Sequence, residues 1–124
     1  MGFFDGLMGN ASEVNIAEVE KEFGNLLAST ERIEKAYKLI RDMFIFTNKR
    51  LILVDKQGLT GKKQEYHSIP YKSITHFSIE TAGSFDLDAE LKIHISGGGM
   101  LEKQFNKNLN IYEVQAVLAE YVLK

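Results

Sequence analysis

A chain of 124 residues with 44% hydrophobic and 26% charged residues has the size and composition of one globular domain. It contains no cysteine, which excludes thiol catalysis, thiolate metal sites and disulfides and suits a reducing compartment. Its formal net charge of −2 lacks the basic excess with which nucleic-acid binders neutralise phosphates.

The first periodic segment begins near Asn15. Apolar residues then recur at helical spacing, at Ile16, Val19, Phe23, Leu26 and Leu27. Asn15 and Glu18 have the spacing of a capping box, with Ser12 as an alternative start. Gly24 interrupts the pattern and costs on the order of 1 kcal/mol relative to Ala. We expect a helix that frays near Gly24, within an N-terminal helical extension of residues 1–28.

From Ile33 onward the hydrophobic period is two, which is typical of strands. The expected strands cover 33–39, 43–47, 51–55, 63–69, 74–81, 90–96 and 100–105. Arg41 and Asp42 separate the first two, so their connection is either a tight hairpin or a bend in one long strand. Asn48 tolerates the positive φ of a two-residue hairpin turn, and the glycines at 97–99 mark another turn. About seven short strands at close spacing indicate a sandwich or barrel.

The last segment predicts an amphipathic helix. Asn110 and Glu113 again have capping-box spacing. One face carries Ile111, Val114, Val117, Leu118, Tyr121 and Val122. Because a helix of this length is not stable alone in water, its apolar stripe must cover a curled sheet. We expect residues 29–124 to form one structural unit of strands closed by this helix.

Two strings and the helix that follows them carry a family resemblance. The strings are TNKRLILVD at 47–55 and IPYKSI at 69–74. In this order they resemble the bacterial pleckstrin-homology (PH) domain family, from about Ile16 to the end of the chain. The resemblance implies a PH-like fold, mainly β with helices, in which two near-orthogonal antiparallel sheets of about seven strands are capped by a C-terminal helix. It also implies no established enzymatic activity, and cyclic oligomers for some members.

No grouping of reactive residues indicates an active site. The three histidines are His67, His76 and His94. They show neither HxH nor HxxxH spacing, so we interpret them as sheet-surface or packing residues. The carboxylates Asp86, Asp88 and Glu90 lack a calcium-loop pattern and indicate a solvated loop and strand edge. We therefore predict no catalytic residue, no metal site, no cofactor and no enzymatic activity.

The N-terminal apolar cluster is the candidate interface. It consists of Phe3, Phe4, Leu7 and Met8, which would share one side of a short helix. The cluster has three alternative placements: it packs on the domain's own core, lies in a subunit interface, or contacts a membrane surface. Asp5 is the only charged residue among residues 1–9, whereas membrane-surface helices usually carry basic residues.

Lys38 and Arg41 are candidate weak anion contacts. Eukaryotic relatives that bind phosphoinositides use basic residues around the first hairpin. Here Asp42 follows Arg41 directly, and no long loop is available to enclose a phosphate. The pattern therefore disfavours phosphoinositide binding.

The sequence favours a non-enzymatic interaction module that self-associates into a homo-oligomer, with a ring as one arrangement. Other proteins are further candidate partners, and nucleic acid is not. The alternative is a peripheral domain that binds a ligand or a lipid surface. No apolar run approaches the roughly 20 residues of a membrane-spanning helix, and residues 1–9 lack the features of a secretory signal, so we expect a cytoplasmic location.

Overall fold

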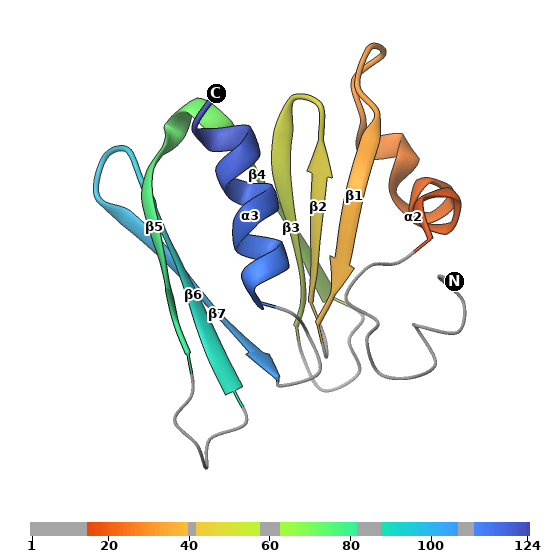
Figure 1. The fold of residues 1–124 in the computed structure, drawn as a ribbon. Coiled ribbons are helices and arrows are strands. Elements are labelled where there is room, and N and C mark those ends of the chain that lie inside the picture. The colour runs from red at the N-terminus through yellow and green to blue at the C-terminus, as the bar shows by residue number, and fades with distance from the viewer. Residues whose placement is uncertain (1–14, 40–41, 58–62, 82–87, 107–110) are drawn as a thin grey trace. The chain divides into compact units, whose positions relative to one another are not determined.

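The computed structural model describes residues 15–39, 42–57, 63–81, 88–106 and 111–124 (Figure 1). The candidate interface residues Phe3, Phe4, Leu7 and Met8 lie outside these ranges, as does Arg41. The chain divides into two compact units, Met1–Ile69 and Pro70–Lys124. Each unit contains one antiparallel sheet and one α-helix among its described residues.

The sheet of the first unit has four strands in the order β1-β2-β3-β4. They are β1 (Ile33–Lys38), β2 (Met43–Thr47), β3 (Arg50–Gln57) and β4 (Lys63–Pro70). β1 and β2 pair antiparallel, and the Leu39 N–H donates to the Asp42 carbonyl at 2.8 Å. Of the two alternatives for this connection, the tight hairpin is therefore confirmed.

Helix α2 (Ile16–Phe23) packs beside β1 (Figure 1). The Asn15 side chain caps it by accepting from the Ala17 N–H at 2.8 Å. Gly24 ends the α-helix, and the chain continues as the 3₁₀ turn η1 (Gly24–Leu26). Val19 and Phe23 form a buried cluster with residues of the sheet, namely Ile33, Ala36, Ile45, Ile52 and Val54. The start and end of this helix predicted from the sequence are confirmed.

The second unit contains a three-stranded sheet in the order β5-β6-β7. Its elements are η2 (Tyr71–Ser73), β5 (Ile74–Glu80), β6 (Asp88–Ile95), β7 (Gly99–Asn106) and α3 (Ile111–Val122). Gly97 and Gly98 adopt φ of 98° and 99° in the turn between β6 and β7. These are left-handed conformations that L side chains rarely adopt, so the triple glycine is a hairpin turn, as predicted. Helix α3 packs against β5, β6 and η2.

Two antiparallel sheets, of four and three strands, with an N-terminal and a C-terminal helix confirm the PH-like fold class. The division of the chain at residues 28 and 29 stays a prediction. No helix in the described part of the chain combines the length and the apolar character needed to cross a membrane.

One prediction about a turn is wrong. No described residue other than glycine has a positive φ, so Asn48 does not use that conformation between β2 and β3. The Thr47 hydroxyl instead accepts from the Lys49 and Arg50 N–H groups at 3.0 and 2.9 Å and holds the turn. The Asn48 side chain accepts from the Arg32 N–H at 2.7 Å and so ties the turn to the segment before β1.

Candidate functional site

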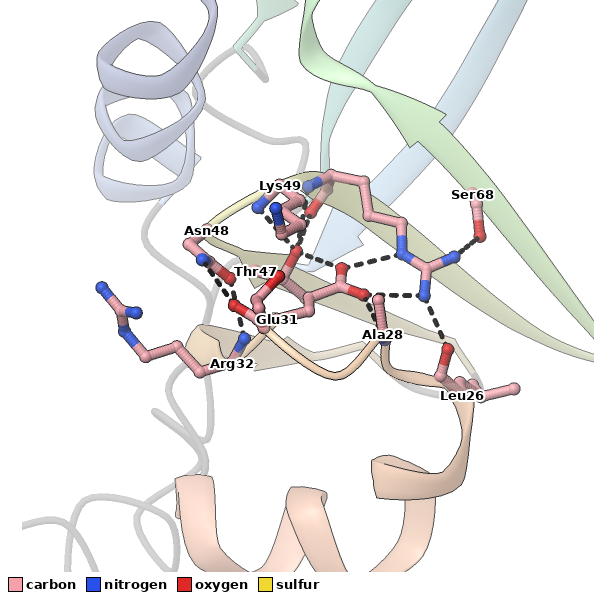
Figure 2. Close-up of polar contacts among 10 residues, drawn as sticks. Leu26, Ala28, Glu31, Arg32, Thr47, Asn48, Lys49 and Ser68 are labelled. Atoms are coloured by element: carbon pink, nitrogen blue, oxygen red, sulfur yellow. Dashed lines mark hydrogen bonds and ion pairs between the residues drawn. The ribbon is translucent and has the colours of Figure 1, made fainter.

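A buried ion pair in the first unit joins the segment before β1 to the start of β3 (Figure 2). The Glu31 side chain is 1% exposed and that of Arg50 is 25% exposed. Arg50 Nε donates to Glu31 Oε2 at 2.8 Å, and Nη2 donates to Oε1 at 3.0 Å. This is a bidentate pair, the geometry that favours arginine over lysine.

Both members of this pair make further hydrogen bonds. Glu31 accepts from the Thr47 hydroxyl at 2.6 Å and from the Ala28 N–H at 3.0 Å. Arg50 donates to the Ser68 hydroxyl and to the Leu26 carbonyl, each at 2.7 Å. Figure 2 shows the carboxylate enclosed by these donors. The charge pair therefore joins η1, the segment before β1, and strands β2, β3 and β4.

The pKa of Glu31 determines what this cluster can do. Burial raises the pKa, but hydrogen bonds from Arg50, Thr47 and Ala28 outweigh it and lower the pKa from 4.5 to about 2. A carboxylate with so low a pKa is a poor proton donor or acceptor near neutral pH. We interpret the cluster as a structural clamp of the first unit rather than as catalytic machinery.

The solvent-facing side of the second sheet is polar, and its residues form three rows across the strands. The register aligns His76 with His94 and Met100, Ser78 with Lys92 and Glu102, and Glu80 with Glu90 and Gln104. Side chains at facing positions of adjacent antiparallel strands are close neighbours. Residues far apart in the sequence therefore share one exposed surface.

Carboxylates cluster in two of these rows. The pKa of Glu90 is raised above 4.5, first by side-chain hydrogen bonding with Glu102 and by the charge of Glu102. Desolvation and then the hydrogen bond and charge of Glu80 act in the same direction. Like charges at short range disfavour full ionisation, so the neighbouring carboxylates favour the protonated form of Glu90. Among the described residues, no group of three or more His, Cys, Asp or Glu is arranged to hold a metal ion.

Two of the three histidines meet on this face. The rings of His76 and His94 stack with their centroids 4.0 Å apart and an interplanar angle of 15°. A register shift between Ile74 and His76 places both Thr75 and His76 on the exposed side of β5. His67 lies on β4 in the first unit and is not part of this pair.

The other residues singled out from the sequence are only partly described. Lys38 is exposed at the end of β1, opposite Met43. Asp86 lies outside the described residues, and Asp88 is the first residue of β6. The candidate interface and the candidate anion contacts therefore stay predictions.

Comparison with known proteins places this architecture in a family. Residues 2–122 match the family model described as "Bacterial PH domain". The uncharacterized protein YjqA of Bacillus subtilis (strain 168) is 60% identical over 121 residues, which are 96% of this chain and 97% of that protein. The uncharacterized protein YozO of the same organism is 40% identical, over 82% of this chain and 88% of its own length.

A solved structure agrees with this assignment. The pleckstrin homology domain from Shewanella amazonensis SB2B superimposes with a TM-score of 0.87 at 52% identity. The match covers 99% of this chain and 100% of that domain. The chain therefore belongs to the bacterial PH domain family, and the resemblance read from its two strings and its terminal helix is confirmed.

Proposed function

We propose that this bacterial PH domain is a non-enzymatic interaction module that associates with further copies of itself. The observation that carries the proposal is a second apolar stripe on α3. The helix buries Ile111, Val114 and Leu118. Away from these residues lie Tyr112, Ala116, Ala119 and Leu123. Tyr112 is 62% and Leu123 is 71% exposed, Ala116 is exposed and Ala119 is half-buried.

The spacing of these four residues places them on one face. Positions separated by three and four residues lie above one another on an α-helix. The helical hydrogen bonding continues past Val122, since the Leu123 N–H donates to the Ala119 carbonyl at 2.9 Å. A helix that is apolar on two opposite sides is typical of one that is covered on both. The outward stripe therefore suits a subunit contact.

A second copy of the chain fits this stripe by symmetry. Two α3 helices that run antiparallel about a twofold axis would bring the same surface of each copy together, as in most homodimers. The small side chains of Ala116 and Ala119 lie at the middle of the stripe and permit close approach. A stable contact needs about 1,000 Å² in total, more than one stripe supplies. The candidate interface residues Phe3, Phe4, Leu7 and Met8 are a second proposed contact, independent of the α3 stripe.

The electrostatics support the non-enzymatic part of the proposal. The buried carboxylate of Glu31 is held ionised by its hydrogen bonds. The raised-pKa carboxyl of Glu90 lies on the exposed face of a sheet. Catalytic acids and bases are usually found instead where a pocket excludes water around them.

Sedimentation velocity of the purified full chain over a wide range of concentration tests the proposal. We expect an oligomer that dissociates in Ala116→Glu, which places like charges against each other at the centre of the stripe. Ala17→Glu is the matched control, because Ala17 is also an exposed helical alanine but lies on α2. A wild-type chain that stays monomeric at high concentration overturns self-association. An oligomer that tolerates Ala116→Glu excludes the α3 stripe as the contact.

A further inference from the structure

The row nearest the β6–β7 turn brings two imidazoles and a thioether together. His76 on β5 faces His94 on β6, and His94 faces Met100 on β7. All three positions are open to solvent: His76 is exposed, His94 is half-buried and Met100 is 47% exposed. Three adjacent strands of one sheet thus present three potential metal ligands side by side.

The two rings are close enough for a single ion. Their centroids are 4.0 Å apart. A metal ion bound by two imidazole nitrogens at about 2.0–2.1 Å holds those nitrogens roughly 3–4 Å from each other. Because the two ring planes are inclined by only 15°, the stacked arrangement does not itself direct both nitrogen lone pairs to one point. Binding requires the His94 ring to turn substantially about its side-chain bonds until one of its nitrogens and Nε2 of His76 point to a common site. Both rings lie on the solvent-facing side of the sheet, so this rotation takes place at the surface.

Thr75 orients one of these rings. Its hydroxyl donates to the His94 carbonyl at 3.2 Å, which uses its single proton. The same oxygen lies 3.2 Å from His76 Nδ1 and therefore accepts from that nitrogen. With the hydroxyl proton on the carbonyl, the contact favours the tautomer protonated at Nδ1, whose Nε2 lone pair can bind a ligand. Metal-binding histidines are commonly oriented by such a partner on the other ring nitrogen.

The thioether of Met100 determines which metal ion the three side chains favour. Thioether sulfur is a soft ligand that selects Cu(I), and imidazole binds copper well in both oxidation states. Zinc and nickel gain little from a thioether. We propose that His76, His94 and Met100 form a copper-binding site on the exposed face of β5, β6 and β7. The cation Lys92 lies in the adjacent row, opposite Glu102 in the strand register.

Competition with a chromophoric Cu(I) chelator under reducing conditions tests the site in the intact chain. We expect His76→Gln and His94→Gln each to weaken Cu(I) binding by about tenfold or more, and Met100→Leu to weaken Cu(I) while leaving Zn(II) binding unchanged. The controls are His67→Gln, which removes the histidine of β4, and Met43→Leu, which removes the thioether at the start of β2. Neither control should change the affinity. Far-UV circular dichroism verifies the fold of each variant.

Two further measurements distinguish a specific copper site from adventitious binding to surface histidines. Thr75→Val removes the orienting hydroxyl without touching a ligand, and we expect it to weaken Cu(I) binding by about tenfold. Added Cu(II) should broaden the backbone NMR signals around His76 and His94 before any others. The proposal is overturned if the double variant His76→Gln/His94→Gln binds Cu(I) as tightly as the wild type. It is equally overturned if the broadening begins at His67 or at the N-terminus.

Discussion

Nε of Arg50, the first residue of β3, lies 2.8 Å from Oε2 of Glu31, which precedes β1. The same guanidinium also reaches Ser68 near the end of β4 and the Leu26 carbonyl in η1. Removing either charge would leave the other buried without its partner, which is far costlier than losing a surface pair. The packing of α2 and η1 beside the first sheet therefore depends on this contact as well as on the apolar cluster.

Arg50→Lys tests this dependence. Lysine keeps the charge but cannot reproduce the forked contact, so we expect the free energy of unfolding to fall by at least about 2 kcal/mol. Urea denaturation measures the change. The control is Arg32→Lys, because Arg32 pairs with Glu34 at 3.3 Å with side chains 69% and 30% exposed. An exposed pair contributes at most about 1 kcal/mol, so equal effects in the two variants would contradict the interpretation.

The pKa of Glu31 predicts a specific acid sensitivity. The native pKa of about 2 lies below the ordinary value of 4.5, so the folded state holds the ionised form more strongly than the unfolded state does. This contribution to stability is fully present above about pH 4.5 and is lost as the pH falls toward about 2, a difference of about 3 kcal/mol. Glu31→Gln should be less stable than the wild type at neutral pH and should lose less stability over that acid range. Parallel pH curves for the two proteins would rule out this role for Glu31.

The sequence predicted the helices and strands because the residue patterns that mark them are local. Asn15 marked the start of α2 and Gly24 its end, and the hydrophobic period of two located each strand within one or two residues. The Glu31–Arg50 pair has no local signal, because the two residues are 19 positions apart and meet only when β1, β2 and β3 pair. The His76–His94 stack was missed for a related reason. The sequence does not fix the register of β5 against β6, and alternation cannot reveal the register shift that turns His76 outward.

Two glycine-to-alanine substitutions should change the stability of the protein in opposite directions. Gly97 has a φ of 98°, so Gly97→Ala should destabilise the fold by about 1–2 kcal/mol. Gly24 has φ −58° and ψ −27° with no atom within 4 Å of an added Cβ. Gly24→Ala should therefore stabilise the protein by about 0.4–1 kcal/mol, chiefly by restricting the unfolded chain. Thermal unfolding distinguishes the two, and destabilisation by Gly24→Ala would show that the end of α2 needs glycine for another reason.

The pKa of the Glu90 carboxyl group tests the contact between Glu90 and Glu102. Hydrogen bonding with Glu102 is the largest cause of its raised pKa, and the negative charge of Glu102 acts in the same direction. Glu102→Gln removes that charge, so we expect the pKa of Glu90 to fall back toward 4.5. Titration of the side-chain carboxyl carbons by NMR measures both proteins. Glu65→Gln is the control, because Glu65 is an exposed carboxylate on β4 in the other unit. If Glu102→Gln leaves the Glu90 titration unchanged, Glu102 does not raise the pKa of Glu90, and burial or Glu80 must account for any elevation that remains.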